Sequence, residues 1–384
     1  MTPNPRPRRA HREVDSLAQL HEVLSTRKTL CGIRIQNLDL SAAGPQLLRR
    51  SDFAGLVVLG GRVPEDVATH LRSHGAILFP AAFDAPVDVY PSGLYTPDDL
   101  YAGLESDGYD ATPDARAYRW SRDPALAGDV YVTLLRAIHD DSITDALDER
   151  LAGRRVAGVM GGHAVQRGDD AYAATAHLGH RLAESGLVVV TGGGPGAMEA
   201  ANFGALTRHT SALDPALARL AAVPSFRTDI GAWAALALEV RADLVDPAES
   251  AVDGTVVRSI GIPTWFYGHE PPNVFCDGIA KYFSNALRED GLLARSTAGV
   301  VVMPGAAGTV QEIFQAVTPL YYAPKGAELP RLVLVGRDHW TRAVPVWPAL
   351  ASLAAGKAMA DRVALVDDAA DAADLLAQNG RSPG

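Results

Sequence analysis

The stretch LVVVTGGGPGA, residues 187–197, joins an apolar run to a glycine-rich turn. A short, nearly continuous apolar run predicts a strand that is buried on both faces, as in a parallel sheet covered by helices. The turn contains glycines, which tolerate positive φ and let a ligand reach backbone N–H groups: Gly192, Gly193, Gly194 and Gly196. A helical pattern follows over 197–206, and a helix N-terminus attracts anions. The stretch therefore indicates either a phosphate-binding turn or a plain tight turn between a strand and a helix.

A second stretch, PGAAGTVQE at residues 304–312, has the same setting. It follows the apolar run 299–303 and opens a helical pattern over 309–322. Thr309 is a natural N-cap residue and Glu312 would complete a capping box with it, so capping alone explains both residues. However, open α/β folds bind ligands at the carboxyl ends of their parallel strands, which meet at one edge of the sheet. We therefore expect the two turns to form one anion pocket.

Strands and helices alternate along the rest of the chain. Strands at 53–59 and 76–79, with a helix at 63–74 between them, form a predicted βαβ unit. The second half is expected to contain strands at 156–160, 187–190, 259–263, 299–303 and 332–335 and helices at 169–185, 279–293 and 309–322, followed by a helix pair. This alternation predicts an α/β fold: a Rossmann-like, doubly wound parallel sheet with an additional N-terminal α/β domain.

The predicted organisation has a short tail and two domains. Residues 1–12, rich in Pro and Arg, are expected to form a flexible tail, residues 13–150 the N-terminal domain, and residues 151–384 the second domain. The second domain contains an Ala-rich, mostly helical insertion at about 207–255. The segment 84–123 has no clear period and predicts loops and short helices that cover a neighbouring element.

Composition restricts the partners. The chain has 384 residues, 47% of them apolar, and a net charge of −10. Nucleic acid requires a basic face and is not expected, whereas a small anion needs only a few local donors. Cys31 and Cys276 lie far apart and predict neither a disulfide framework nor a cysteine-based metal site. Because neither a signal peptide nor a membrane-length apolar run is found, we expect a soluble, cytoplasmic protein that does not bind membranes.

The two turns resemble, in the same order, the loops of the LOG-like proteins, which are often labelled lysine decarboxylases. Those loops read GGG-x-x-G and P-G-G-x-G-T-x-x-E, and the resemblance covers about residues 154–340. It implies that residues 151–384 form a nucleotide-binding domain with phosphoribohydrolase activity. The extra N-terminal domain and the stretch HEPPN at 269–273 resemble the longer nucleoside 5′-monophosphate nucleosidases.

Such a nucleosidase hydrolyses the N-glycosidic bond of AMP, GMP or a similar nucleotide to a free base and ribose 5-phosphate. The resemblance implies no metal and no cofactor. It also implies a homo-oligomer, either a dimer or a tetramer. The helix expected at 309–322 carries a large apolar and aromatic surface, which belongs either to the subunit interface or to the core.

The resemblance assigns roles residue by residue. The residues implied to bind phosphate or nucleotide are Gly192, Gly193, Gly194, Gly196, Pro304, Gly305, Gly308 and Thr309. Glu312 matches the final glutamate of the second loop and is implied to be catalytic. Two positions depart from the pattern of the second loop. Ala306 stands where the pattern has its second glycine, and Gln311 stands where the residue before the final glutamate is often acidic.

A further departure concerns the catalytic arginine. The family commonly carries M-H-x-R-K on the preceding helix, but here that segment reads IAKYFSNALRE at 279–289. Arg288 lies about one residue from the expected spacing and is the first candidate, and Lys281 is the second. For either residue, a solvated helix face is the alternative.

The expected chemistry follows from the bond to be cleaved. Hydrolysis of an N-glycosidic bond passes through an oxocarbenium-like ribose, which requires a nearby carboxylate. Glu312 is expected to stabilise that charge or to activate water. Arg288 is expected to hold phosphate or ribose and to keep Glu312 ionised. Asn202 and His163 are weaker candidates for a ligand contact, each with a structural or solvent-exposed alternative.

Two other function classes stay open. A non-catalytic nucleotide-binding or sensing protein would use the same turns, and the absent M-H-x-R-K string favours it. An NAD-dependent oxidoreductase is the weaker alternative. The loose fingerprint Gly192-x-Gly194-x-x-Ala197 follows the second strand, whereas a dinucleotide-binding fingerprint follows the first strand.

Overall fold

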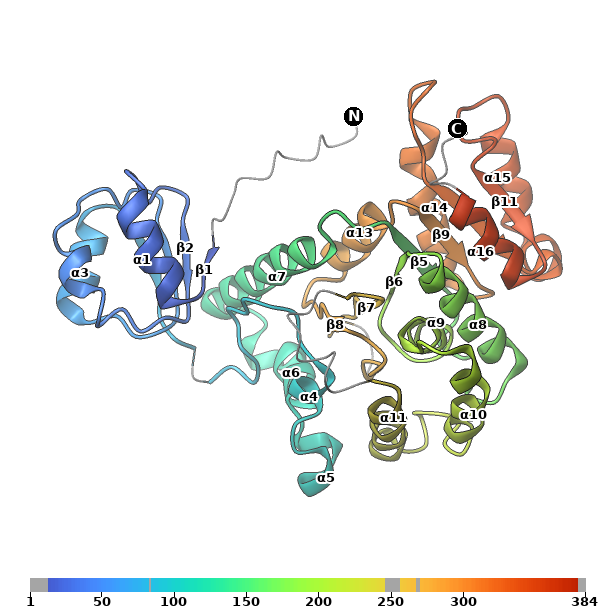
Figure 1. Ribbon diagram of the computed structural model, residues 1–384, viewed down its shortest axis with the longest axis horizontal. Helices are drawn as coiled ribbons and strands as arrows, with labels where there is room; N and C mark the ends of the chain where they lie inside the picture. Colours follow the sequence, from blue (N-terminus) through green and yellow to red (C-terminus); the bar gives the residue numbers. More distant parts are fainter. Residues whose placement is uncertain (1–12, 83, 246–255, 267–269, 379–384) are drawn as a thin grey trace. The chain divides into compact units, whose positions relative to one another are not determined.

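The computed structural model describes residues 13–82, 84–245, 256–266 and 270–378 (Figure 1). The chain divides into two compact units. Unit 1 comprises the residues up to Gly93 together with Gly128–Ala146, and unit 2 comprises Leu94–Ala127 together with Leu147–Gly384. The tail expected at 1–12 lies outside the described residues.

This division differs from the boundary predicted at residue 150. The segment Leu94–Ala127 belongs to unit 2 although it precedes the last part of unit 1 in the sequence. Its partners explain the difference: Tyr95 exchanges backbone hydrogen bonds of 3.0 and 2.8 Å with Ile279, and the Tyr101 hydroxyl donates to the Pro272 carbonyl at 2.6 Å. These contacts span more than a hundred residues, so no local pattern reveals them.

Unit 1 is built on a four-stranded, all-parallel sheet in the order β1-β2-β3-β4. Its strands are β1 (Glu13–Val14), β2 (Arg34–Gln36), β3 (Val57–Leu59) and β4 (Ile77–Phe79), and its helices are α1 (Leu17–Thr26), α2 (Gly44–Leu47) and α3 (Glu65–Ser73). A core of buried apolar residues lies between α1, α3 and the sheet. The predicted N-terminal α/β fold is thereby confirmed. The division between the units falls within helix α7 (Val130–Leu151).

Unit 2 contains a seven-stranded, all-parallel sheet in the order β11-β10-β9-β5-β6-β7-β8. Its strands are β5 (Val156–Met160), β6 (Val188–Thr191), β7 (Ser259–Gly261), β8 (Gly278–Ile279), β9 (Gly299–Val302), β10 (Arg331–Val335) and β11 (Val363–Val366). The central strands β5, β6 and β9 are buried along their whole length, as their apolar sequences predict. The doubly wound, Rossmann-like architecture is confirmed.

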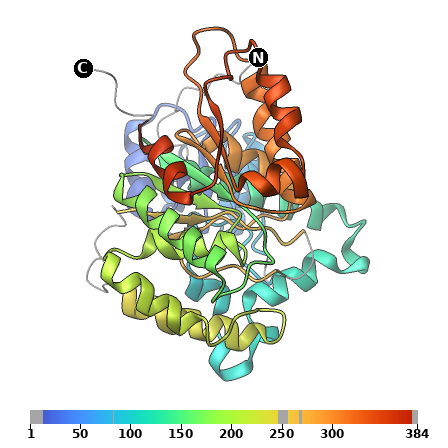
Figure 2. The same ribbon diagram turned by 90° about the vertical axis from the view of Figure 1, so that its right-hand side faces the viewer.

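Helices cover this sheet on both faces. The described helices are α4 (Pro97–Tyr101), α5 (Leu104–Asp107), α6 (Pro113–Arg122), α8 (Asp170–Glu184), α9 (Ala197–Leu206), α10 (Thr210–Leu220), α11 (Ile230–Leu244), α13 (Asn285–Arg295), α14 (Ala307–Tyr321), α15 (Trp347–Ala354) and α16 (Ala369–Gln378). Helices α8, α9 and α16 pack side by side and share a core with β5, β6, β9 and β10. Helices α14 and α15, drawn in orange to red, contact each other (Figures 1 and 2). None of the described helices combines the length and apolar composition that crossing a bilayer requires.

Two predicted elements differ in the structure. The helix expected at 279–293 begins only at Asn285, where the Ser284 side chain caps it by accepting from the N–H of Leu287. The preceding residues extend the sheet pairing, since Ala280 and Tyr282 donate to the carbonyls of Gly261 and Pro263. The expected C-terminal helix pair also encloses a seventh strand, β11. The described part of the insertion at 207–255 contains helices α10 and α11, which a non-helical segment joins; residues 246–255 lie outside the described part.

Candidate active site

The two glycine-containing turns lie at the point where the sheet reverses its winding. The chain runs from β5 through β6 and β7 to β8 along one half of the sheet, and then crosses to β9 on the other side of β5. In open α/β sheets, ligands bind at the carboxyl ends of the strands beside such a switch point. The turns after β5, β6 and β9 meet here. Gly162, after β5, donates to the carbonyl of Pro304 at 3.1 Å and accepts from the N–H of Ala197 at 3.2 Å.

The first turn needs glycine at three positions, two for their backbone conformation and one for the close approach of a side chain. Gly193 and Gly196 have φ of 69° and 75°, which side-chain-bearing residues rarely adopt. Glycine is needed at position 192 for a different reason: a Cβ atom there would lie 2.3 Å from Nη2 of Arg288. Glycine at position 192 therefore allows an arginine to reach the backbone of the turn.

The second turn leads into α14 and differs from the prediction in one respect. Ala306 is the N-cap residue, no side chain caps the helix, and Thr309 lies in the first turn. The expected capping box of Thr309 and Glu312 is therefore wrong. Ala306 has φ of −114° and ψ of −150°, an extended conformation that alanine adopts freely, so the loss of the glycine at this position strains nothing.

The anion pocket expected from the sequence would include Thr309 and the start of α14. Thr309 is buried beneath Gly305, where a Cβ atom would lie 2.2 Å from the Thr309 hydroxyl oxygen. Residues 306–308 are exposed. The backbone N–H groups of residues 307–309 have no acceptor among the described residues. Such donors at a helix N-terminus are suited to bind an anion.

Arg288 connects the first turn to Glu312. Its Nε donates to the carbonyl of Ile262 at 2.8 Å, and its Nη2 donates to the carbonyl of Gly192 at 3.2 Å. Its Nη1 lies 3.7 Å from Oε1 of Glu312. The guanidinium is buried, so the solvated helix face considered for Arg288 is not what the structure shows. The catalytic pair predicted from the sequence thus lies within ion-pair distance.

The pKa of Glu312 is shifted in the direction opposite to the one expected from Arg288. Burial raises the pKa of the Glu312 carboxyl, the charge of Arg288 opposes this rise, and the nearby carboxylate of Glu289 adds to it, so that the net shift is upward. Arg288 therefore acts in the predicted direction but is outweighed. A carboxylate with raised proton affinity is a stronger base than a solvent-exposed glutamate.

Lys281, the second candidate for a catalytic cation, is occupied elsewhere. Its Nζ lies 2.6 Å from Oδ1 of Asp114 on α6, and both side chains are fully buried. Trp265 Nε1 and the Tyr109 hydroxyl each donate to the same carboxylate at 2.8 Å. Burial lowers the pKa of Lys281, and Asp114 opposes that shift. Lys281 thus pairs with Asp114 in the interior and not with Glu312; the alternative of a solvated helix face is wrong for this residue as well.

The segment from Glu270 to Asn273 contacts the first turn, which motif reasoning alone did not predict. Asn273 donates from its backbone to the carbonyl of Gly193 at 2.8 Å and from Nδ2 to that of Gly194 at 3.1 Å. Glu270 lies near Gly194, and its Oε1 is 3.5 Å from Nδ1 of His163. Its only signal in the sequence was the HEPPN stretch; His269 of that stretch lies outside the described residues.

Asn202 holds the floor of the first turn. Its side chain is buried, donates to the Ser259 hydroxyl at 2.8 Å and accepts from Nδ2 of Asn273 at 3.0 Å. It also accepts from the hydroxyl of Thr191, which in turn accepts from the N–H of Gly193. These bonds satisfy the Asn202 amide, so its role is structural.

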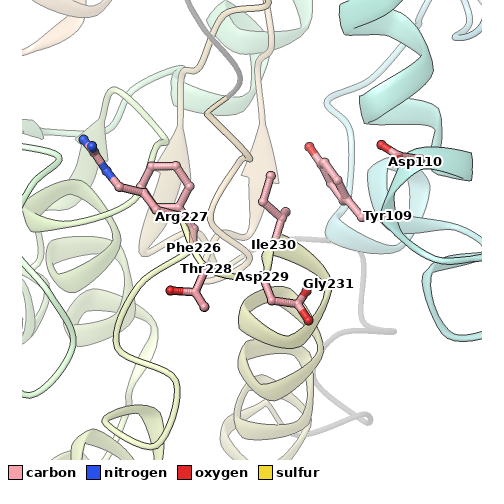
Figure 3. Close-up of a pocket in the computed structure, with 8 residues that line it drawn as sticks. All are labelled: Tyr109, Asp110, Phe226, Arg227, Thr228, Asp229, Ile230 and Gly231. Carbon is pink, nitrogen blue, oxygen red and sulfur yellow. The ribbon is translucent and has the colours of Figure 1, made fainter.

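Two cavities adjoin the segment 224–231. The inner cavity, of about 250 Å³, is lined by Pro195 and Gly196 of the first turn and by His163, Phe226, Arg227 and Trp233. The outer cavity, of about 490 Å³, shares Phe226 and Arg227 with it. Figure 3 shows the Tyr109 ring on one side of the outer cavity and Phe226 and Ile230 on the other. Arg288 and Glu312 line neither cavity.

Comparison with known proteins supports the resemblance to LOG-like proteins at the level of the superfamily. Residues 154–213 match the model of the SLOG cluster4 family, so this part of the chain fits a SLOG/LOG-like superfamily. The matched segment contains the turn after β5 and the first glycine turn, and it ends before Arg288 and Glu312. No curated protein matches the chain.

Proposed function

We propose that the protein hydrolyses the N-glycosidic bond of nucleoside 5′-monophosphates, such as AMP or GMP, to a free base and ribose 5-phosphate. One observation carries the proposal: buried Arg288 contacts both the carbonyl of Gly192 and the carboxylate of Glu312 at the switch point of the sheet. Phosphate-binding turns alone would fit many nucleotide-binding proteins. A buried carboxylate beside them is the group that glycosidic cleavage requires.

The reaction assigns a task to each part of the site. The N–H groups at the start of α14 and the glycines of the first turn hold the phosphate. Glu312 takes a proton from water as the water oxygen bonds to C1′ of the ribose. The C1′–N bond breaks, its electron pair stays on the base nitrogen, and the base takes a proton from solvent. Arg288 orients Glu312 and binds ribose or phosphate through its remaining donors.

We assign the base to the inner cavity. This cavity lies next to Pro195 and Gly196, and its lining includes the rings of Phe226 and Trp233, which pack edge to face and give a planar base an aromatic surface to contact. The carboxylate of Glu199, which also lines it, is engaged by Arg167 at 3.2 Å from Nε. His163 also lines this cavity, is about half exposed and is paired with Glu270, and we assign it a contact with the base edge.

The test is base release from a panel of purified nucleoside monophosphates, followed by chromatography. The wild-type protein should release free base from at least one member. Glu312→Ala should lower turnover by on the order of 10²–10³-fold, as expected when a group that stabilises the transition state is removed, and should leave nucleotide binding largely intact. Undiminished turnover in Glu312→Ala contradicts the assignment of Glu312.

A second candidate function is a nucleotide-binding protein without hydrolysis. The observation that favours it is the extent of the family match, which contains the first glycine turn but neither Arg288 nor Glu312. The same panel separates the two candidates, since saturable binding without any free base would select the binding protein. A homo-oligomeric state and a cytoplasmic location remain predictions under both functions.

A further inference from the structure

Two carboxylates, not one, lie against Arg288. Nη1 of Arg288 is 3.7 Å from Oε1 of Glu312 on α14 and 3.9 Å from Oε1 of Glu289 on α13. All three side chains are at least four-fifths buried, with exposed fractions of 10%, 16% and 9% for Arg288, Glu312 and Glu289. One positive charge therefore faces two acidic groups in a poorly solvated place, where charge interactions are stronger than in water.

Glu289 is held in this position by Gln311. Nε2 of Gln311, the residue just before Glu312 on α14, donates to Oε2 of Glu289 at 2.9 Å. Gln311 is one of the two departures from the second-loop pattern. A neutral amide at this position can donate to Glu289, whereas an acidic residue would repel it. The carboxylate on α13 and the amide on α14 thus form a matched pair that fixes Glu289 beside the guanidinium.

The charges that act on Glu312 come from α13. Arg288 and Glu289 are the charged neighbours that influence its ionisation among the described residues, and they act in opposite directions. Asp290, the next acidic residue of α13, instead accepts a hydrogen bond from Gln315, one turn further along α14. On the other side, His339 lies against Gly305, with Nε2 2.9 Å from its carbonyl oxygen.

We propose that Glu289 is a positioning residue of the candidate active site, which shares Arg288 with Glu312 and so leaves Glu312 only part of the arginine's charge. The inference rests on the proposed function for its catalytic consequence. A general base works best when its proton affinity approaches the working pH. Glu289 shares the positive charge of Arg288 and repels the carboxylate of Glu312. Both effects raise the proton affinity of Glu312 and make it a stronger base for taking the proton from water.

The test compares Glu289→Gln with the matched control Asp290→Asn. Each variant removes one negative charge from neighbouring positions of the same helix, and each leaves an amide partner on α14 in place. In Glu289→Gln, Arg288 acts on Glu312 alone, so the acid limb of the pH profile of kcat/KM should move to lower pH and the plateau of kcat should fall. Asp290→Asn should retain the wild-type profile, and Glu289→Asp should give an intermediate one. Coincident profiles for Glu289→Gln and Asp290→Asn would overturn the proposal.

A second readout separates this inference from the proposed function. If the wild-type protein releases no base, hydrolysis is wrong, but the coupling of Glu289 to Glu312 is still measurable from the pH dependence of thermal unfolding. Glu289→Gln and Asp290→Asn should then give different curves, and the difference should disappear when both are made in a Glu312→Gln background. A difference that persists without Glu312 shows that Glu289 acts on stability by another route and overturns the proposal.

Discussion

Removal of the Asp114 carboxylate should severely destabilise unit 2. Its carboxylate accepts from Nζ of Lys281 at 2.6 Å, from Nε1 of Trp265 at 2.8 Å and from the hydroxyl of Tyr109 at 2.8 Å. Asp114, Lys281 and Trp265 are each 1% exposed. Asp114→Ala therefore leaves a buried ammonium without its counter-charge and orphans a buried indole N–H.

The magnitude follows from these contacts. Removing one partner of a buried ion pair typically costs about 3–5 kcal/mol, because the remaining charge stays in the interior unpaired. The orphaned donors would add about 1–3 kcal/mol each if they acted independently, but groups in one network are not additive. We therefore expect Asp114→Ala to lower the free energy of unfolding of unit 2 by at least about 3 kcal/mol.

Tryptophan fluorescence during urea unfolding measures this loss. All five tryptophans of the chain lie in unit 2, so the signal reports that unit alone. The double variant Asp114→Leu with Lys281→Met should recover most of the stability, because an apolar pair can replace a buried ion pair at little cost. Asp110→Ala is the control, since its partner Arg119 lies 3.7 Å away and the Asp110 side chain is 97% exposed; its effect should be close to zero.

The pH dependence of the free energy of unfolding tests the direction of the pKa shift of Lys281. Burial lowers the pKa of Lys281 in the folded protein, so the unfolded chain binds more protons over the interval between the two pKa values. Stability linked to Lys281 therefore rises with pH through that interval. Without Asp114 to oppose the desolvation, the interval widens toward lower pH, and Asp114→Ala should lose less stability at alkaline pH than at neutral pH. A loss below about 1 kcal/mol at neutral pH, or a double variant no more stable than Asp114→Ala, would refute the reasoning.

Further predictions concern the site and its surroundings. Burial raises the pKa of the Glu312 carboxyl above its usual 4.5, so the folded state binds the proton of this carboxyl more tightly than the unfolded state does. The stability of the folded protein therefore falls as pH rises through the folded pKa. Glu312→Gln should unfold at a higher temperature than wild type at neutral pH, and equal melting temperatures would contradict this. Thr309→Val should raise KM more than it lowers kcat, because a phosphate contact is uniform binding; a loss in kcat alone counts against the phosphate assignment. Gly192→Ala should displace Arg288, whose Nη2 would lie 2.3 Å from the new Cβ, and should slow base release while nucleotide binding persists; wild-type turnover would show that Arg288 is dispensable. Tyr322, 75% exposed at the end of α14, is expected at the subunit interface; Tyr322→Glu should lower the molar mass measured by light scattering, and an unchanged mass would exclude this surface.

The features that could be predicted from the sequence share one property: their cause is local. An apolar run such as 187–190 specifies a buried strand by itself, and the backbone conformation of Gly193 or Gly196 is required within its own turn. Five of the seven parallel strands of unit 2 were expected from their apolar runs, and the alternation of strands with helices predicted the doubly wound arrangement. Glu312 could be named as a candidate because the family resemblance places a glutamate at that position after the second turn.

The features that were missed arise from contacts between distant segments. Strand β8 is two residues long and pairs with β7, and this pairing converts the start of an expected helix at 279–293 into an extended segment. Lys281 and Asp114 lie 167 residues apart, so nothing near Lys281 indicates a buried partner. The contacts of Glu289 with Arg288 and Gln311 were hidden for the same reason, since they depend on the packing of α13 against α14.

The segment 94–127 makes the first glycine turn dependent on the N-terminal half of the chain. Asp114 of α6 binds Lys281, and the Tyr101 hydroxyl binds the carbonyl of Pro272, the residue before the asparagine that holds the carbonyls of Gly193 and Gly194. A chain cut at the boundary predicted from the sequence, residue 150, would lose both anchors and keep a buried, uncompensated Lys281. The charge alone opposes folding of such a fragment. Unit 2, which contains the proposed nucleotide site, is therefore discontinuous in sequence, and the segment 94–127 is as much a part of it as the turns that carry the glycines.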